Sequence, residues 1–419
     1  MKVRIIPSLI DGSLRAPTSK SVAQLAIAAA SLSQSESIIK NITWSNNVYA
    51  AISVAESLGS ICTILENKLK IFGGKGTRTN AMNCGDSALC MRMFAPIAAL
   101  NKNEIKIFAN ESLSKRPTGM LEEALKQAGA VCTTQNGFPP VTVKGPMKGG
   151  IINVDGSVSS QVLTGLLIAL PLLQEQSTLH VNSLVNKEYI DITLSLMNSF
   201  GVCVENHDYK QFVIPGNQSY KPTKYTVEGD WSGSSFLMVG AAIAGKVKII
   251  NLSIQSFQPD KKIVDVLKMV GASIKIKENE IVCKHKSLHA FSFDATDCPD
   301  LFPSLIALAA RCKGKSRIIG THRLLYKESN RLEILIREFS KMGVLIKNEE
   351  NSLIVESGQL RSVEIFPEND HRIAMATAIT YLGSNQAPII HQAECVNKSF
   401  PGFWDEIKCL GIQTEIMYA

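Results

Sequence analysis

Charged and titratable residues stand at the start of segments that are otherwise apolar. In NDHRIAMATAIT, Asp370, His371 and Arg372 directly precede a run from Ile373 that is apolar enough to be buried. Asp and Ser are ordinary N-caps, because their side chains accept hydrogen bonds from free backbone amides. A cation is different, since the helix dipole disfavours positive charge at an N-terminus unless an anion lies nearby. Lys20, in TSKSVAQ, and Arg372 therefore predict a negatively charged ligand.

More cations lie in the connecting segments. SKRPTGM places Arg116 before a proline and a helix, and NKSFPGF contains Lys398. YKESNRLEI predicts Lys327, Glu328 and Arg331 in the first turn of another helix. On an exposed helix Glu328 and Arg331 would form a surface ion pair that contributes about 0.2–0.5 kcal/mol. If the helix starts converge, these cations would line a cleft between two domains that suits a ligand with several phosphate or carboxylate groups.

The elements that must position these residues form a repeat. A helix-period segment, a glycine and a short strand-like run recur six times, with the glycines spaced 70, 72, 70, 72 and 68 residues apart. Such a glycine suits a helix C-cap, because a left-handed residue lets the chain turn into a strand. The six glycines are Gly59, Gly129, Gly201, Gly271, Gly343 and Gly411.

Each repeat also contains a second, more apolar helix, and these inner helices are expected to be central because they are apolar on nearly every face. Runs such as EIKIFA, TLHVNSL, KVKIINLSI and SRIIGTHRL are β-branched and alternate, which predicts strands. Six α/β units divide most simply into two domains of three, with a junction near YTVEGDWSG. The inner helices are predicted to begin near Ser21, Asp86, Ser159, Ser232, Pro299 and His371.

Composition agrees with this division. The chain has 419 residues, 45% of them hydrophobic, and single cores stop growing at roughly 250–300 residues. Its net charge of +7 is scattered, which suits anionic small molecules better than nucleic acid, although a merely basic surface explains the charge equally well. Ten dispersed cysteines without a C-x-x-C pair indicate reduced core residues rather than a zinc site or disulfides. No segment is apolar and long enough for a signal peptide or a membrane span, so we expect a cytoplasmic protein.

Nine motifs carry a resemblance to a known family. In chain order they are SKS, KRP, SSQ, YIDITL, VEGDWS, PD, KESNRL, DHRIAMA and KSFP, and they resemble the 5-enolpyruvylshikimate-3-phosphate synthases over nearly the whole chain. The resemblance implies an α/β fold of two similar inside-out barrel domains, each of three repeats of about 70 residues. It implies an N-terminal domain at 14–228, a C-terminal domain at 1–13 plus 229–419, and an active site in the cleft between them. The family precedent is a monomer that needs no metal or organic cofactor.

The implied reaction joins phosphoenolpyruvate to the 5-hydroxyl of shikimate 3-phosphate. Inorganic phosphate is released through a tetrahedral intermediate, in the shikimate pathway to chorismate and the aromatic amino acids. By their motifs, the residues that resemble phosphoenolpyruvate ligands are Lys20, Arg116, Gln161, Arg331, Arg372 and Lys398. Those that resemble shikimate 3-phosphate ligands are Ser21, Ser159, Ser160, Gln161, Tyr189, Asp300 and Lys327.

The resemblance also implies the catalytic groups, which are Asp300, Glu328 and Lys20. Asp300 is expected to be the partner of the attacking hydroxyl, and Glu328 the acid that protonates the methylene carbon, which requires a raised pKa. The sequence leaves open which carboxylate handles which step. His371 is either a proton shuttle or a supporting hydrogen-bond donor, and Asp230 is expected to be a hinge or a helix cap.

Three positions depart from the family pattern. Leu25 replaces an arginine that holds the shikimate carboxylate, so either another cation substitutes or the acceptor binds weakly. Asn186 replaces a phosphate-binding serine, and its amide can still donate to phosphate. Ala88 and Leu89 stand where most relatives have Gly and Thr beside the phosphoenolpyruvate pocket, which suggests poor inhibition by glyphosate.

Three other functions fit the sequence less well. The enolpyruvyl transferases that act on UDP-N-acetylglucosamine lack the combination of KESNRL and DHRIAMA, and their loop cysteine has no counterpart here, because Cys84 and Cys90 lie in another motif. RNA 3′-terminal phosphate cyclases use related repeats, but the chain has no basic stripe with interleaved aromatic residues. A non-catalytic relative with a binding role is favoured only by Leu25.

Overall fold

The computed structural model describes residues 1–74, 76–325 and 327–418, and the chain divides into two compact units. Unit 1 comprises Met1–Pro17 and Glu228–Ala419, and unit 2 comprises Thr18–Val227. The chain therefore passes from one unit to the other after Pro17 and again after Val227. In the described part of the chain, no helix has the length and hydropathy needed to cross a membrane.

Unit 2 contains three four-stranded sheets of one topology. In each sheet the first two strands are parallel and the other two neighbouring pairs are antiparallel. In spatial order the sheets are β14 (Lys224–Thr226), β3 (Glu36–Lys40), β5 (Lys68–Phe72) and β4 (Ile61–Leu65); β6 (Ala81–Asn83), β7 (Glu104–Phe108), β9 (Phe138–Lys144) and β8 (Val131–Gln135); and β10 (Ile151–Asp155), β11 (Ser177–Asn182), β13 (Gln211–Ile214) and β12 (Glu205–His207).

Unit 1 repeats this topology three times. The N-terminal strand completes its last sheet, with Lys2 opposite Met417 and Ile5 opposite Thr414. The sheets are β2 (Ile10–Arg15), β15 (Gly245–Ile250), β17 (Glu280–Lys284) and β16 (Ser273–Lys277); β18 (Ser292–Asp294), β19 (Lys315–Ile319), β21 (Ser352–Glu356) and β20 (Leu345–Glu349); and β22 (Glu364–Ile365), β23 (Ile389–Ile390), β1 (Lys2–Ile5) and β24 (Thr414–Met417).

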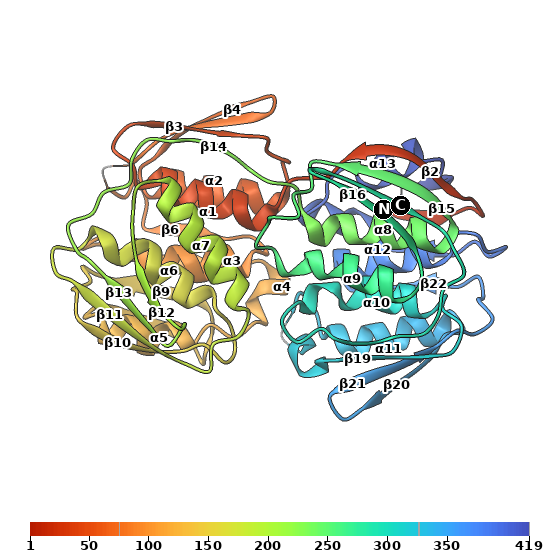
Figure 1. The fold of residues 1–419 in the computed structure, drawn as a ribbon. Coiled ribbons are helices and arrows are strands. Elements are labelled where there is room, and N and C mark those ends of the chain that lie inside the picture. The colour runs from red at the N-terminus through yellow and green to blue at the C-terminus, as the bar shows by residue number, and fades with distance from the viewer. Residues whose placement is uncertain (75, 326, 419) are drawn as a thin grey trace. The chain divides into compact units, whose positions relative to one another are not determined.

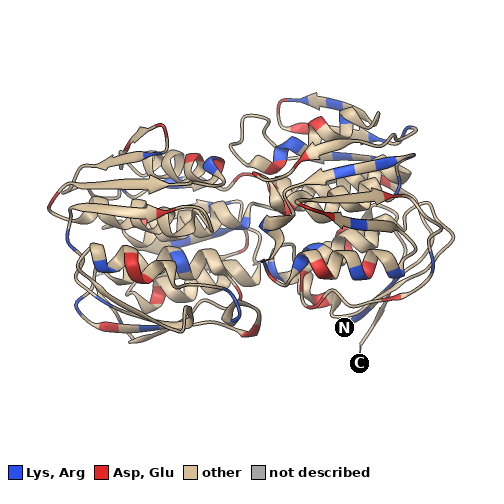
Figure 2. Cartoon of the chain, turned by 90° about the horizontal axis from the view of Figure 1, so that it is seen from below, with Lys and Arg blue, Asp and Glu red and all other residues tan. Residues whose placement is uncertain are grey.

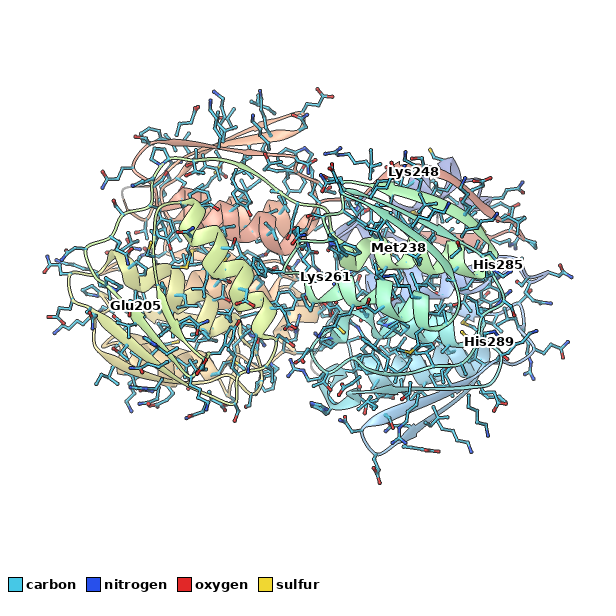
Figure 3. All side chains as sticks on the ribbon, viewed as in Figure 1. Glu205, Met238, Lys248, Lys261, His285 and His289 are labelled. Atoms are coloured by element: carbon cyan, nitrogen blue, oxygen red, sulfur yellow. The ribbon has the colours of Figure 1, made fainter. Side chains whose placement is uncertain are left out.

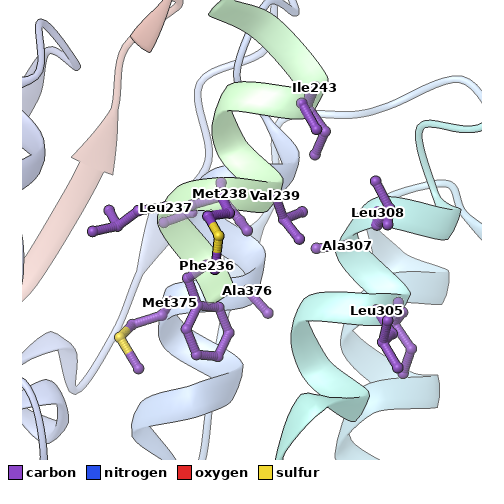
Figure 4. Packing of buried hydrophobic residues seen from close by; sticks show 14 of the residues in the cluster. Phe236, Leu237, Met238, Val239, Ile243, Leu305, Ala307, Leu308, Met375 and Ala376 are labelled. Carbon is purple, nitrogen blue, oxygen red and sulfur yellow. The ribbon is translucent and has the colours of Figure 1, made fainter. Parts of the chain in front are cut away.

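The apolar inner helices form where the sequence predicts them, and each lies within its unit's core. Every residue of the fourth inner helix is buried, which explains why its sequence is apolar on all faces. In unit 1 the inner helices pack on one another through Phe236, Leu305 and Met375 among others (Figure 4). The six helices are α1 (Lys20–Ser31), α3 (Ala88–Ala98), α6 (Gln161–Ala169), α8 (Trp231–Ala244), α10 (Phe302–Ala309) and α12 (His371–Thr380).

The amphipathic outer helices end as predicted. Each is followed, two residues after its last helical residue, by one of the six glycines, and all six have φ between 76° and 100°. At Gly59 a β-carbon would lie 2.0 Å from the carbonyl oxygen of Gly76, so both the left-handed backbone and the close approach require glycine. The outer helices, labelled in part in Figure 1, are α2 (Asn46–Ser57), α5 (Met120–Gln127), α7 (Lys187–Ser199), α9 (Ile263–Met269), α11 (Arg331–Lys341) and α13 (Phe403–Cys409).

Short helical turns complete the description. They are α4 (Glu111–Ser114), η1 (Leu170–Leu172), η2 (Pro259–Lys262), η3 (Pro299–Leu301), η4 (Thr321–Leu324) and η5 (Ala393–Lys398). Lys and Arg residues occur along both units together with Asp and Glu residues (Figure 2), which agrees with the scattered charge of the sequence.

Four local predictions are wrong. The run SRIIGTHRL is a strand only to Ile319, because Gly320 adopts φ +111° and a 3₁₀ turn follows. The run KVKIINLSI is a strand only to Ile250, because Asn251 adopts φ +71°. Lys327 and Glu328 do not lie in the first turn of a helix, because α11 begins only at Arg331. The cysteines are all free thiols, but they are not all core residues: six are buried, and Cys203 and Cys409 are exposed.

Candidate active site

In unit 1, three cationic side chains donate hydrogen bonds to one carboxylate. Asp300, in the turn η3 that opens α10, accepts hydrogen bonds from Lys327 Nζ at 3.2 Å, Arg331 Nη1 at 3.2 Å and Arg372 Nη2 at 2.9 Å. Burial alone would raise the pKa of Asp300, but the charges of Arg372, Lys327 and Arg331 outweigh it and hold the pKa well below its ordinary value. Asp300 is therefore ionised at neutral pH, and it remains 20% exposed and accessible to a ligand.

Arg331 is the most enclosed of these cations, with its side chain fully buried. Its Nε donates to Asp370 Oδ2 at 2.8 Å, and its Nη2 donates to Asp370 Oδ1 and to Glu328 Oε2. Although burial disfavours its charge, Asp370, Glu328 and Asp300 raise the pKa of Arg331 further above its ordinary value. The sequence-based alternative of a surface ion pair between Glu328 and Arg331 is wrong, because the Glu328 side chain is only 14% exposed and both residues belong to a buried network.

Asp370 links two helix starts, and the sequence assigned it no role beyond a cap. It is fully buried, it caps α12 by accepting from the backbone amide of Arg372 at 3.0 Å, and it accepts from Ser329 Oγ at 3.2 Å. The same carboxylate holds Arg331 at the start of α11. The signal in the sequence was an acidic N-cap that precedes a buried helix, but only the fold reveals that this cap is also a counter-ion.

Arg372 is held from two sides. Its Nη2 donates to Asp300, and its Nη1 donates to the hydroxyl of Ser232 in the first turn of α8. Its Nε is buried and has no hydrogen-bond partner among the described residues. Since Asp300 supplies a counter-charge, the position of Arg372 at a helix N-terminus does not by itself require a bound anion, in contrast to the sequence argument.

The remaining candidates of unit 1 flank this network. Lys398, at the end of η5, is buried and its Nζ donates to the carbonyl of Asn369 at 3.0 Å. His371 is fully buried beside Asp370. Asp230 caps α8 by accepting from the amide of Gly233 at 3.1 Å, which confirms the predicted capping role.

In unit 2, the predicted ligands lie at the starts of α1 and α6. Lys20 and Ser21 are the first two residues of α1, and both are half-buried. Gln161 is the first residue of α6, and its backbone N–H donates to Ser159 Oγ at 3.2 Å. Ser160, between them, is buried. A helix N-terminus with hydroxyl groups is a ready site for a phosphate, because backbone amides point outward there.

Arg92, in the middle of α3, contacts a candidate site residue and was not identified from the sequence. It is buried, its Nη1 donates to Gln161 Oε1 at 3.0 Å, and its Nη2 donates to the carbonyl of Pro117 at 2.7 Å. Burial and the charge of Arg116 lower the pKa of Arg92 to about 9. Arg92 therefore connects α3 with the predicted ligand Gln161 and with Pro117, the residue that follows Arg116. The signal was a single arginine within the otherwise apolar segment CGDSALCMRM.

A second buried contact connects α1 with α3. Ser87 Oγ donates to Gln24 Oε1 at 2.6 Å, and Gln24 Nε2 donates to the carbonyl of Lys20 at 3.1 Å. Ser87 also caps α3, so Ala88 is its first helical residue, and it is buried. Leu25 follows Gln24 and lies in the apolar core of unit 2 with 3% of its surface exposed.

The last two candidates lie at the start of α7. Asn186 occupies the N-cap position with φ +56°, and its Oδ1 is buried without a hydrogen-bond partner in the part of the chain that the structure describes. Tyr189, in the first turn, is half-buried, and its carbonyl accepts from Thr193 Oγ1 at 2.9 Å. Among the described residues no group of three or more His, Cys, Asp or Glu side chains is arranged to hold a metal ion.

The family model and the curated relatives that match this chain carry the same description. Residues 5–407 match the family model described as EPSP synthase (3-phosphoshikimate 1-carboxyvinyltransferase). The chain is 37% identical over 416 residues to the 3-phosphoshikimate 1-carboxyvinyltransferase of Clostridium perfringens, covering 98% of both proteins. It is also 37% identical over 413 residues to that of Clostridium kluyveri, covering 98% of this chain and 97% of the relative.

Solved structures share the fold. An EPSP synthase from Acinetobacter baumannii superposes with a TM-score of 0.84 at 24% identity, over the whole of both chains. The enolpyruvyl transferase NikO from Streptomyces tendae gives a TM-score of 0.83 at 14% identity, over 100% of this chain and 99% of that one. At these identities the likeness concerns the mixed α/β fold.

Proposed function

The chain belongs to the EPSP synthase family, and from this premise we propose which of its residues carry the reaction. Its activity is that of a 3-phosphoshikimate 1-carboxyvinyltransferase, a transferase of the shikimate pathway. The enolpyruvyl group of phosphoenolpyruvate moves to the 5-hydroxyl of shikimate 3-phosphate, and inorganic phosphate is released. The observation that carries the residue assignment is the convergence of Lys327, Arg331 and Arg372 on Asp300.

The reaction has an addition step and an elimination step. In the addition, the 5-oxygen of the acceptor bonds to C2 of phosphoenolpyruvate, the hydroxyl proton leaves, and C3 gains a proton. In the elimination, the bond between C2 and the phosphate oxygen breaks and C3 loses a proton, which restores the double bond. The addition therefore needs one group that accepts a proton and one that donates a proton, and the elimination needs a group that accepts the proton from C3.

Asp300 and Glu328 supply these groups in our proposal, together with Lys20. Asp300 is ionised and can accept the hydroxyl proton, although its three cations make it a weak base until substrate binding draws some of them away. Glu328 shares Arg331 with Asp370, so a substrate anion that binds Arg331 would weaken this contact and raise the pKa of Glu328. A raised pKa is what a general acid at neutral pH requires.

The substrate ligands in our proposal follow the family motifs. Arginine suits phosphate and carboxylate groups because its planar fork donates two parallel hydrogen bonds. We assign phosphoenolpyruvate to Lys20, Arg116, Gln161, Arg331, Arg372 and Lys398. We assign shikimate 3-phosphate to Ser21, Ser159, Ser160, Gln161, Tyr189, Asp300 and Lys327, with Asn186 as a further phosphate donor.

Two further expectations concern the whole molecule. We propose that the three sheets and inner helices of each unit form an inside-out α/β barrel, which the repeated sheet topology and the buried inner helices support. On the family precedent we also propose a monomer that works in the cytoplasm.

Phosphate release tests this function. Mixing the protein with phosphoenolpyruvate and shikimate 3-phosphate is expected to release inorganic phosphate, and omitting either substrate is expected to abolish the release. Replacing the acceptor with UDP-N-acetylglucosamine is expected to give none. Asp300→Asn is expected to lose most activity, whereas Asp294→Asn, at an exposed position in the same segment, is expected to keep it. Release with UDP-N-acetylglucosamine, or binding of both substrates without release, would contradict the proposal.

A further inference from the structure

Glu338 is a buried carboxylate that the proposed mechanism does not use. It lies in the second half of α11, and its side chain is fully buried, unlike that of an exposed acidic residue such as Glu205 (Figure 3). It accepts hydrogen bonds from Arg337 Nε at 2.7 Å and from Lys341 Nζ at 2.9 Å. Because a buried carboxylate is costly unless it is paired and hydrogen-bonded, these two cations explain how the helix tolerates Glu338.

A third contact connects Glu338 with a segment outside its helix. Its Oε2 accepts from the backbone N–H of Phe366 at 3.2 Å. The neighbouring Arg337 donates from Nη2 to the backbone carbonyl of Phe366, also at 3.2 Å. The carboxylate and the guanidinium together therefore bind both backbone groups of Phe366, the first residue of the segment Phe366–Asp370 that joins β22 to α12.

The segment Phe366–Asp370 carries groups that hold two of the proposed phosphoenolpyruvate ligands. The carbonyl of Asn369 accepts from Lys398 Nζ at 3.0 Å, and the carboxylate of Asp370 accepts from Arg331 Nε at 2.8 Å. The segment lies between a strand and a helix, and the two residues before Asp370 have φ of +48° and +61°, which residues other than glycine rarely adopt. Contacts from outside the segment are therefore needed to keep these groups in place.

Helix α11 supplies such contacts at both ends of the segment. Arg331 and Glu338 are seven residues apart, which is close to two helical turns, so both lie on one face of α11. Arg331 contacts Asp370 at the end of the segment, and Glu338 contacts Phe366 at its start. The segment therefore follows one face of α11 in the opposite direction to the helix, and loss of the Glu338 contact would leave its first residue without the acceptor for its backbone N–H.

We propose that Glu338 is a positioning residue for phosphoenolpyruvate binding. Through the backbone of Phe366 it holds the segment Phe366–Asp370 in place, and this segment orients the side chains of Lys398 and Arg331. The inference rests on the proposed function, because it assumes that both cations bind phosphoenolpyruvate. Glu338 itself does not touch the substrate.

The test compares Glu338→Gln with Glu349→Gln, which removes the same charge at an exposed position on β20, the strand that follows α11. Glutamine keeps the size of the side chain but offers one oxygen where the carboxylate offers two. We expect Glu338→Gln to raise KM for phosphoenolpyruvate about tenfold, because a small displacement of binding groups has a large effect. KM for shikimate 3-phosphate and kcat should change much less, and Glu349→Gln should keep the wild-type values.

A purely structural role of Glu338 would give a different result. Partial unfolding reduces the number of active molecules, which lowers the apparent kcat and leaves both KM values unchanged. The melting temperature of Glu338→Gln is expected to fall, because the substitution breaks buried ion pairs. A folded variant is nevertheless expected, since the side chains of Arg337 and Lys341 are 37% and 40% exposed and can turn to solvent.

A second variant, Glu338→Asp, separates the reach of the side chain from its charge. Aspartate keeps the charge for Arg337 and Lys341 but is one methylene shorter, so it is expected to lose the contact with the N–H of Phe366. It should raise KM for phosphoenolpyruvate and lower the melting temperature less than Glu338→Gln does. An unchanged KM for phosphoenolpyruvate in both variants, whatever their melting temperatures, would overturn this inference alone. A wild-type protein that releases no phosphate from both substrates would instead overturn the proposed function, and this inference with it.

Discussion

Leu25→Arg, which introduces the arginine that the resemblance to the family implies at this position, most directly tests how this chain binds its acceptor. Leu25 lies in α1 with 3% of its surface exposed, packed in the apolar core of unit 2. Replacing it removes a buried leucine side chain, which costs about 1.5–3 kcal/mol, and an arginine that has no anionic partner there adds the further cost of a buried charge. The loss of the leucine alone lowers the melting temperature of a unit of this size by about 3–12 °C, so a decrease of at least this size is expected when no acceptor is bound.

The stabilising effect of Leu25→Arg is expected only when the acceptor is bound. The resemblance to the family implies that an arginine at this position binds the carboxylate of shikimate 3-phosphate. A charge-assisted hydrogen bond of this kind contributes about 1.5–3 kcal/mol to binding. Leu25→Arg should therefore lower KM for shikimate 3-phosphate by about 10- to 150-fold. Addition of the acceptor should also recover part of the lost melting temperature, because a ligand that binds only the folded state stabilises it.

The assay is steady-state phosphate release at saturating phosphoenolpyruvate and varied shikimate 3-phosphate. Leu25→Met is the matched control, because it keeps the volume and apolar character of the side chain without the charge. KM for phosphoenolpyruvate is expected to stay unchanged in both variants. A folded Leu25→Arg protein with the same acceptor KM as Leu25→Met would refute the reasoning and indicate that another group holds the shikimate carboxylate.

Three further predictions concern other positions. Ala88→Gly, at the buried first residue of α3, should shift glyphosate inhibition to lower concentrations, and an unchanged inhibition curve would refute the link. Asp300→Asn should lower the melting temperature at pH 7, because the depressed pKa of Asp300 means that its ionised form stabilises the fold; the difference from wild type should shrink as the pH falls below about 4. A difference that does not depend on pH would argue against this ionisation. Arg92→Lys should lower kcat/KM for phosphoenolpyruvate about tenfold, because lysine cannot reach both Gln161 and Pro117; an unaltered value in a folded variant would contradict it.

Much of the fold was predictable because its signals are local. A glycine that must adopt a positive φ after a helix can be recognised from the sequence around it, and the six glycines that follow the outer helices were identified. Two strands were predicted to be too long, because THRL after Gly320 and NLSI after Ile250 alternate like strands, but THRL forms a 3₁₀ turn and β15 ends at Ile250. The apolar inner helices were recognised because burial on every face leaves an unambiguous composition.

The site was less predictable, because its pairings join residues far apart in the chain. Motifs identified Asp300, Arg331 and Arg372, but the partners that hold them came only from the fold. The hydrogen-bonded residues Asp370 and Arg331 are 39 positions apart in the chain. Arg92 and Gln161 are 69 positions apart, and Ser232 and Arg372 are 140 positions apart. A cap, a lone arginine in an apolar helix and a serine carry no local sign of such a partner.

The measurement that tests the central claim most directly is the fate of hydrogen at C3 during turnover in heavy water. Protonation of C3 by an exchangeable acid such as Glu328 makes a methyl group, and the later loss of one of its three hydrogens leaves solvent deuterium in the product. By mass spectrometry we expect the enolpyruvyl product formed in heavy water to carry deuterium in its methylene group, and we expect Glu328→Gln to form this product much more slowly than wild type. A product without deuterium, or a Glu328→Gln variant that forms it as fast as wild type, would contradict protonation of C3 by Glu328.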